Sequence, residues 1–215
     1  MANCIDETVK IKVVALDFDG VITNLDIDWN TAIRQASKIA GYDVKSLLTF
    51  YEKCFGEPIF QKVSSEMEQI ESEASSKAQI QPSLKEFLLK LSQKKIDAYV
   101  VSMQSQRVVE GFLNQRGLAG FFKDVVTREK CPGKKGQVEC VIQESGKTPR
   151  QVLFVDDLKR NINLCKELDV ECFHFHRNQN QNETEQEWNK VLSLIDEKEE
   201  SHRRVGLLRN RSKNT

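Results

Sequence analysis

Short apolar runs alternate with helical patterns along most of this 215-residue chain. The first run, residues 11–16, is rich in β-branched residues and has no polar alternation, which is typical of a strand buried on both faces of a sheet. Similar runs lie at residues 96–101, 124–127, 151–155 and 171–175. Strands that alternate with helices indicate βαβ units, so we expect an α/β fold with a doubly wound, Rossmann-like parallel sheet.

One segment, residues 25–79, interrupts this alternation. Three helical patterns follow one another there without an intervening strand pattern. Asp28 is expected to cap the first helix, and Pro58 suits the first turn of the third. We therefore expect a small helical cap inserted into an α/β core that comprises residues 1–24 and 80–180.

The last part of the chain is expected to leave the sheet. Thr184 and Glu187 have the spacing of a capping box, which predicts a C-terminal helix at residues 183–200. The sequence then becomes basic, and residues 201–215 are expected to form a disordered tail.

Charge and hydropathy limit the partners of the chain. Lys and Arg together number 32, as do Asp and Glu, so the formal net charge is zero and a nucleic-acid partner is not expected. The acidic start does not resemble a signal peptide, and no apolar run approaches the roughly 18 residues that span a bilayer. The six cysteines show no metal-binding spacing. We expect a cytoplasmic protein without membrane contact.

Polar groups gather where the predicted strands end. Asp17 and Asp19 follow the first strand, Ser102 follows the second, and Asp156 and Asp157 follow the fourth. The carboxyl ends of parallel strands meet at one edge of a sheet, so these side chains are expected to lie together. Crowded carboxylates repel one another unless a cation holds them, and oxygen ligands of this kind suit Mg²⁺.

This set of groups suits phosphoryl transfer. A carboxylate can attack phosphorus and form an aspartyl-phosphate, while a second carboxyl protonates the leaving oxygen and then activates water. Asp17 and Asp19 are two residues apart, so both point to one side of an extended backbone, and Gly20 allows a sharp turn after them. A lysine and a hydroxyl would neutralise and orient the phosphoryl oxygens.

Four segments, in this order, resemble the motifs of the haloacid dehalogenase superfamily. They are Asp-Phe-Asp-Gly-Val at residues 17–21, Ser102 after Tyr-Val-Val, Gly-Lys-Lys-Gly-Gln-Val at residues 133–138, and Phe-Val-Asp-Asp at residues 154–157. The resemblance covers residues 13–175. In having a second aspartate in the first motif, the chain resembles the phosphatase and phosphomutase branches of that superfamily.

The resemblance implies a role for each motif residue. Asp17 would be the nucleophile and a metal ligand. Asp19 would be the general acid and base and would bind the metal through its backbone carbonyl. Asp156 would bind Mg²⁺, and Ser102 would bind phosphate together with one lysine. Asp157 either supports the metal ligands from behind or is only the first residue of the next loop.

The third motif leaves three candidates for the phosphate-binding lysine. Lys135 fits best because Gly-Gln-Val and a predicted helix follow it directly. Lys134 is the first alternative and Lys130 the second.

The resemblance implies Mg²⁺-dependent hydrolysis of a small phosphomonoester, and a small phosphorylated metabolite as substrate. A phosphomutase of the same superfamily and a non-catalytic module that binds a phosphate ligand are the alternatives. Residues 25–79 match the family's helical cap in position and composition, and their start most resembles phosphoglycolate-phosphatase-like members.

Overall fold

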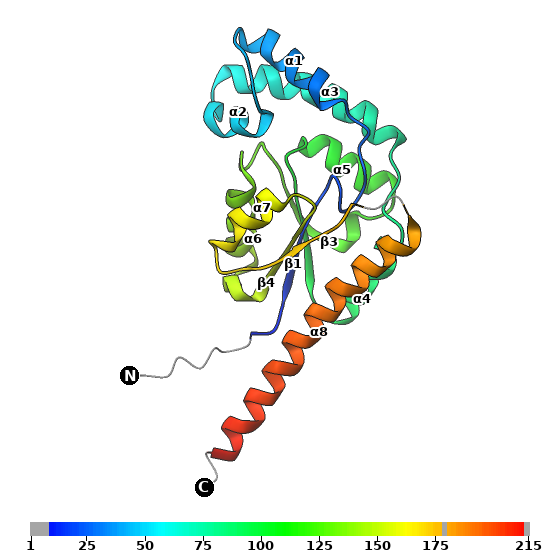
Figure 1. Cartoon of the computed structure of the whole chain (residues 1–215), viewed down its shortest axis with the longest axis vertical. Helices are drawn as coiled ribbons and strands as arrows, with labels where there is room; N and C mark the ends of the chain where they lie inside the picture. The colour runs from blue at the N-terminus through cyan, green and yellow to red at the C-terminus, as the bar shows by residue number, and fades with distance from the viewer. Residues whose placement is uncertain (1–8, 178–179, 213–215) are drawn as a thin grey trace, which may run out of the picture.

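The computed structural model describes residues 9–177 and 180–212, with side chains up to residue 201. Its centre is a five-stranded parallel sheet in the order β3-β2-β1-β4-β5. The strands are β1 (Val13–Asp17), β2 (Asp97–Val101), β3 (Phe122–Val126), β4 (Val152–Asp156) and β5 (Glu171–His174). The predicted doubly wound parallel sheet is confirmed, with β1 in the middle position (Figure 1).

Helices cover both faces of the sheet and explain why its strands lack polar alternation. Along β1, Val14 and Leu16 pack into one hydrophobic cluster, while Val13 and Ala15 pack into another on the opposite face. The first cluster includes residues of α4 (Leu84–Gln93), α5 (Gln106–Gln115) and α8 (Gln181–Ser212); the second includes residues of α6 (Lys134–Ser145) and α7 (Lys159–Lys166). Two short 3₁₀ helices, η1 (Ala119–Phe121) and η2 (Pro149–Gln151), precede β3 and β4.

Residues 25–79, called the cap from here on, form three helices above the carboxyl edge of the sheet (Figure 1). They are α1 (Trp29–Ala40), α2 (Leu47–Cys54) and α3 (Pro58–Lys77). The side chain of Asp28 accepts hydrogen bonds from two backbone amides of α1, as predicted, and Gly41 ends α1 with φ 77°. The cap has its own hydrophobic cluster around Phe50, Phe60 and Met67.

The two chain segments that connect the cap to the core run side by side. Thr23 and Ile80 form an antiparallel bridge. The Thr23 hydroxyl donates to the carbonyl oxygen of Gln79 at 2.7 Å, and the amide of Gln81 donates to the carbonyl oxygen of Ile22 at 2.8 Å. The cap therefore leaves and rejoins the core at one point.

A buried arginine fixes the cap against the core. Arg128, in the loop after β3, is fully buried and donates to Glu71 Oε1 at 2.5 Å and to Ser64 Oγ at 2.8 Å, both on α3. It also donates to the carbonyl oxygen of Met103 at 2.8 Å, while the amide of Ser105 donates to Glu71 Oε2 at 3.0 Å. Buried charges of this kind are stable only when paired and hydrogen-bonded. The network therefore joins α3 to the loops that follow β2 and β3.

The predicted capping box at the C-terminal helix is wrong. Helix α8 begins at Gln181, so Thr184 and Glu187 lie inside it. The Thr184 hydroxyl donates back to the carbonyl oxygen of Asn180 at 3.1 Å, and Glu187 accepts a hydrogen bond from the amide of His176 at 3.0 Å. Glu187 thus holds the segment after β5 rather than the start of its own helix.

The end of α8 also differs from the expectation. The helix continues to Ser212 and includes residues 201–212, which the sequence analysis assigned to a disordered tail. These residues contain Leu and Arg, which favour helices, and no proline. Residues 213–215 lie outside the described part. Among the described residues, every helix is either too short or too polar to span a bilayer.

Candidate active site

Three carboxylates meet at the carboxyl edge of the two central strands. Asp17 is the last residue of β1 and Asp156 the last residue of β4, and Asp157 follows directly. One oxygen from each of the three lies within 4.8 Å of the others. Asp17 is 7% exposed and Asp156 is fully buried. The structure therefore brings together the carboxylates that the strand ends predicted.

Lys134 is the cation beside this cluster. It is the first residue of α6, is almost completely buried, and donates to Asp17 Oδ1 at 2.8 Å and to the carbonyl oxygen of Val101 at 2.9 Å. Its Nζ lies 3.9 Å from Asp156 Oδ2. Burial lowers the pKa of Lys134, but Asp17 and Asp156 outweigh this effect and the net shift is upward. Lys134 therefore balances part of the negative charge of the cluster.

The structure places Lys134, and not the preferred Lys135, beside the carboxylates. The Lys135 side chain points away from the carboxylates and donates to Glu167 on the surface at 2.8 Å. Consecutive residues of an α-helix point about 100° apart, so only one of two adjacent lysines faces the sheet edge. Lys130 is also outside the site and pairs with Asp124 at 3.1 Å and with Glu144.

Ser102 lies at the same edge but already has a partner. It follows Val101, which is opposite Asp17 in the register of β1 and β2, and it is fully buried. Its hydroxyl donates to the side-chain oxygen Oε1 of Gln104 at 2.6 Å and accepts a hydrogen bond from the backbone amide of Gln104 at 3.1 Å. Gln137 of α6 donates to the carbonyl oxygen of Ser102 at 2.7 Å. The hydroxyl is thus oriented by Gln104, which the sequence analysis did not single out.

Asp19 lies beside the cluster, directly before the turn at Gly20. Its Oδ1 accepts a hydrogen bond from the Leu25 amide at 2.8 Å and lies 3.4 Å from Arg177 Nη2. Burial raises the pKa of Asp19 to about 6, although Arg177 acts in the opposite direction. A carboxyl with this pKa exchanges its proton readily near neutral pH, which suits a general acid and base.

Asp156 is held rigidly by groups of the following helix. Its Oδ1 accepts from the Leu158 amide at 2.8 Å, and the Asn161 side-chain amide lies 3.1 and 3.0 Å from its two oxygens. Burial, together with the charge of Asp17, raises the pKa of Asp156 to about 8. Its charged form therefore depends on nearby positive charge.

Asp157 has one anchored and one open oxygen. Arg177 Nε donates to Oδ2 at 3.0 Å, and His174 Nε2 lies 2.9 Å from the backbone carbonyl oxygen, to which it donates. Oδ1 is buried and has no hydrogen-bond partner among the described residues. A buried carboxylate oxygen of this kind is available to a cation.

Sequence reasoning missed Arg177 and Asn161, and both could have been found. Asn161 lies on the first turn of the helix after Asp156, where a side chain can reach back to the strand end. Arg177 follows β5 closely, just as the other site residues follow their strands. The rule that sites form at the carboxyl ends of parallel strands applies to both.

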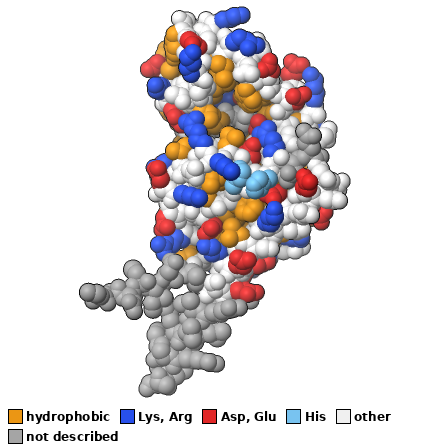
Figure 2. Space-filling view, viewed as in Figure 1, with side chains coloured by type: hydrophobic (Ala, Val, Ile, Leu, Met, Phe, Trp, Pro, Cys, Tyr) orange, Lys and Arg blue, Asp and Glu red, His pale blue; other side chains and the backbone are white. Residues whose placement is uncertain are grey.

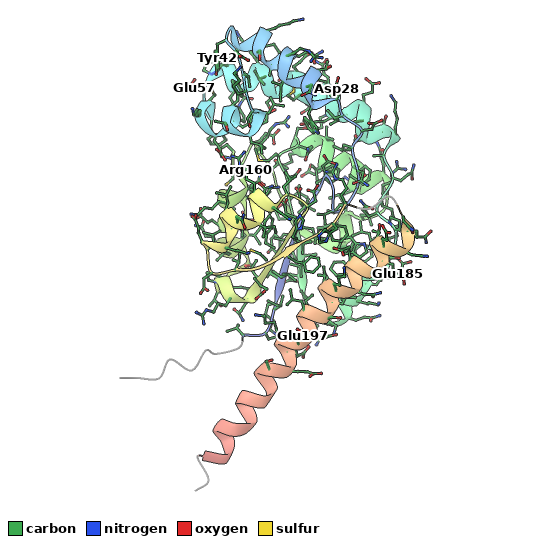
Figure 3. All side chains as sticks on the ribbon, in the orientation of Figure 1. Asp28, Tyr42, Glu57, Arg160, Glu185 and Glu197 are labelled. Carbon is green, nitrogen blue, oxygen red and sulfur yellow. The ribbon has the colours of Figure 1, made fainter. Side chains whose placement is uncertain are left out.

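A cavity of about 580 Å³ lies between the cap and these residues. Figure 3 shows side chains of α2 and of the core facing each other here, with Arg160 labelled on the core side. Residues of both parts line the cavity: Asp17, Asp19, Trp29, Ile33, Lys45, Ser46, Leu47, Leu48, Tyr51, Glu71, Met103, Gln104, Lys134, Asp157, Leu158, Asn161 and Arg177. A ligand here would therefore contact the carboxylates and the cap together.

The family model of the haloacid dehalogenase-like hydrolases matches residues 14–175. The chain belongs to this family. It is similar to the phosphoglycolate phosphatase of Vibrio cholerae, with 25% identity over 182 residues that cover 73% of this chain and 80% of that protein. It is also similar to that of Pseudomonas putida, with 26% identity over 96 residues; this match covers 43% of the chain and 35% of that relative. The resemblance seen in the four motifs is thereby confirmed, as is the expectation of a phosphatase-type enzyme.

Solved structures of the family share the fold of this member. A haloacid dehalogenase-like hydrolase from Streptococcus pneumoniae superposes with a TM-score of 0.61 at 14% identity, covering 86% of this chain and 98% of that one. A family enzyme from Bacteroides thetaiotaomicron, crystallised with magnesium and inorganic phosphate, gives a TM-score of 0.54 at 19% identity and covers 79% of this chain and 96% of that one. At these identities the likeness concerns the fold.

Gly20 provides a test of how closely the site is packed. Its φ is 98°, and a Cβ placed on it would lie 2.4 Å from Asp157 Cγ and 2.6 Å from Arg177 Nη2. Gly41 has a similar φ of 77°, yet a Cβ there would meet no atom within 4 Å. The two glycines therefore share a positive φ but differ in what surrounds them.

We expect Gly41→Ala to lower the free energy of unfolding by about 1 kcal/mol, because alanine is strained at positive φ. Gly20→Ala should lower it further, because its Cβ also overlaps Asp157 and Arg177. Only Gly20→Ala should lower phosphomonoesterase activity, by at least about tenfold, because Asp157 and Arg177 must move. Urea denaturation and steady-state kinetics measure the two effects. Equal activities in the two variants would contradict this description of the site.

Proposed function

We propose that this protein hydrolyses a small phosphomonoester in a Mg²⁺-dependent reaction, through an aspartyl-phosphate on Asp17. The observation that carries the proposal is the pair of Asp17 and Lys134, 2.8 Å apart at the inner end of the cavity, with Asp19 also lining it. A nucleophile, a cation for phosphoryl oxygens and a general acid thus converge on one space. The relatives named phosphoglycolate phosphatases support a small phosphorylated substrate.

The residues at this edge fit a magnesium ion. Asp17, Asp156 and Asp157 offer only oxygen donors, one of which is the unpartnered Oδ1 of Asp157. Mg²⁺ prefers a few carboxylates and completes its shell with water and substrate phosphate. Asp19 would add its backbone carbonyl, as the family resemblance implies. The bound ion would supply charge neutralisation for the carboxylates and the phosphoryl oxygens.

In the first step the Asp17 carboxylate attacks phosphorus. A bond forms between the Asp17 oxygen and phosphorus as the bond between phosphorus and the ester oxygen breaks. Asp19 gives its proton to the leaving oxygen, which departs as an alcohol. A pKa of about 6 lets Asp19 hold this proton in part of the molecules near neutral pH.

In the second step the roles of the two aspartates change. Asp19, now a carboxylate, takes a proton from a water molecule, whose oxygen attacks the phosphorus of the aspartyl-phosphate. The bond between Asp17 and phosphorus breaks, so inorganic phosphate leaves and the Asp17 carboxylate is restored. Arg177 and the Leu25 amide hold Asp19 in place through both steps.

Lys134 and Ser102 would bind the phosphoryl oxygens. Lys134 is fixed between Asp17 and the Val101 carbonyl oxygen, so its ammonium needs little reorganisation when charge develops on the phosphoryl group. The Ser102 hydroxyl would turn from Gln104 to the substrate, leaving Gln104 to line the cavity. Lys134 takes the phosphate-binding role for which the sequence analysis preferred Lys135.

The enzyme class is tested by phosphate release from a panel of phosphomonoesters. We expect release with Mg²⁺, loss of release with a chelator, and at least about a 10³-fold loss in Asp17→Asn, because an amide cannot replace the nucleophile. Asp196→Asn is the matched control, since Asp196 lies on α8, is half exposed and pairs with Lys94 at 2.5 Å. Substantial Mg²⁺-dependent release by Asp17→Asn would overturn the mechanism, and an isomerised sugar phosphate without free phosphate would indicate a mutase.

The adjacent lysines give a second test. Lys134→Met should lower kcat/KM by about 10²-fold or more, because it removes the cation at the developing negative charge. Lys135→Met removes a charge of the same kind from the next position, where it contacts Glu167 on the surface, and should change kcat/KM by less than about twofold. A larger loss in Lys135→Met than in Lys134→Met would restore the original preference for Lys135.

A further inference from the structure

The two ends of the cavity differ in chemistry. Its floor, at the sheet edge, consists of charged groups around Asp17 and Lys134. Its upper wall consists mainly of hydrophobic side chains from two cap helices and two core loops. These upper-wall residues are Trp29, Ile33, Leu47, Leu48, Tyr51, Met103 and Leu158. In the space-filling view, hydrophobic side chains surround the hollow between cap and core (Figure 2).

Two large hydrophobic side chains of the upper wall remain exposed to solvent. Trp29, at the start of α1, is 36% exposed, and Leu158, in the loop before α7, is 46% exposed. One belongs to the cap and the other to the core, so a ligand between them would bury apolar surface of both. Burial of apolar surface is the dominant favourable contribution in most ligand pockets.

The cations that line the cavity already have anionic partners. Lys134 pairs with Asp17, and Arg177 pairs with Asp157 and Asp19. The remaining one, Lys45, pairs with Asp43, and its side chain is 84% exposed, so it lies at the rim rather than against the upper wall. Among the described lining residues, none offers an unpaired buried cation to a second anionic group of a substrate.

Glu71 is the anionic cap residue that lines the cavity. Both of its carboxylate oxygens are engaged, one by Arg128 and the other by the Ser105 amide. Glu71 therefore adds no positive charge with which a second carboxylate on the substrate could pair. A short charged acid would therefore find few partners above the floor and would leave most of the 580 Å³ unfilled.

We infer that the substrate's leaving group carries a bulky apolar body, such as a ring, which packs between Trp29 of the cap and Leu158 of the core. The inference rests on the proposed phosphomonoester hydrolysis at this same site and specifies the alcohol that is released. It distinguishes this chain from the relatives named for phosphoglycolate, a short acid. The charged floor holds the phosphate, and the apolar upper wall selects the alcohol.

A pair of simple esters tests this inference. Ethyl phosphate and 2-phenylethyl phosphate both release a primary alcohol, so their difference reports contacts with the ring rather than leaving-group acidity. We expect kcat/KM for 2-phenylethyl phosphate to exceed that for ethyl phosphate by at least about tenfold, and to exceed that for 2-phosphoglycolate. A ratio near one, or a preference for 2-phosphoglycolate, would overturn the inference and leave the proposed hydrolysis intact.

Substitutions in the upper wall test whether its side chains cause the expected preference for 2-phenylethyl phosphate over ethyl phosphate. Trp29→Ala and Leu158→Ala should each lower the ratio of the two kcat/KM values by about threefold or more. Leu89→Ala is the matched control, because Leu89 is 50% exposed on α4 and does not line the cavity; it should leave the ratio unchanged. Ratios that stay at the wild-type value in both upper-wall variants would contradict the assigned contacts.

Binding of phosphonates, which the enzyme cannot hydrolyse, tests the apolar subsite independently of the proposed hydrolysis. Ethylphosphonate and 2-phenylethylphosphonate keep the phosphorus group but have no ester bond to cleave. Calorimetry with Mg²⁺ should give a Kd at least about tenfold lower for 2-phenylethylphosphonate. If no ester in the panel is hydrolysed while this difference in Kd persists, the proposed function fails and the apolar subsite stands. Equal Kd values would overturn the subsite.

Discussion

The mutual repulsion of carboxylates at one edge of the sheet is the constraint on which the site depends. Asp17, Asp156 and Asp157 place oxygens within 4.8 Å of one another, and Asp156 is fully buried. Burial, together with the charge of Asp17, raises the pKa of Asp156 and the pKa of Asp157. The fold counters the repulsion with the buried ammonium of Lys134 and the guanidinium of Arg177. The proposed Mg²⁺ would add further positive charge beside Asp157 Oδ1, which has no hydrogen-bond partner among the described residues.

The same constraint explains the position of the cap. A cluster of incompletely balanced charges gains most from substrate and cation when bulk water is excluded, since electrostatic interactions strengthen in a low-dielectric site. The Arg128 network joins α3 to the loops after β2 and β3, and one of these loops also provides Met103 and Gln104 to the cavity. The contacts that hold the cap over the charged floor thus also shape the apolar upper wall.

Much of the fold and part of the site could be predicted from the sequence. The strands were visible because each is buried on both faces, and Asp17, Asp19 and Asp156 were found because they stand where strands end. The sequence did not predict which lysine lies beside Asp17, because this depends on where α6 begins. It begins at Lys134 rather than near Gly136, and this early start brings Lys134 to Asp17. Which of two adjacent side chains faces the sheet thus depends on the residue at which the helix begins.

Other features depend on contacts between segments far apart in the chain. Arg177 reaches Asp19 and Asp157 only because β5 lies next to β4. Glu187 has the spacing of a capping residue, but its carboxylate binds the His176 amide instead. Local patterns predict local hydrogen bonds, and tertiary partners can displace them.

Rapid acid quench of the enzyme during turnover of a hydrolysed ester, followed by peptide mass spectrometry, tests whether a covalent intermediate forms on Asp17. Acid preserves an acyl phosphate long enough for it to be mapped. The mechanism predicts a phosphoryl group on the peptide that contains Asp17, and none on that peptide in Asp17→Asn. A phosphoryl group on another residue, or turnover at full rate with none detected on Asp17, would contradict it.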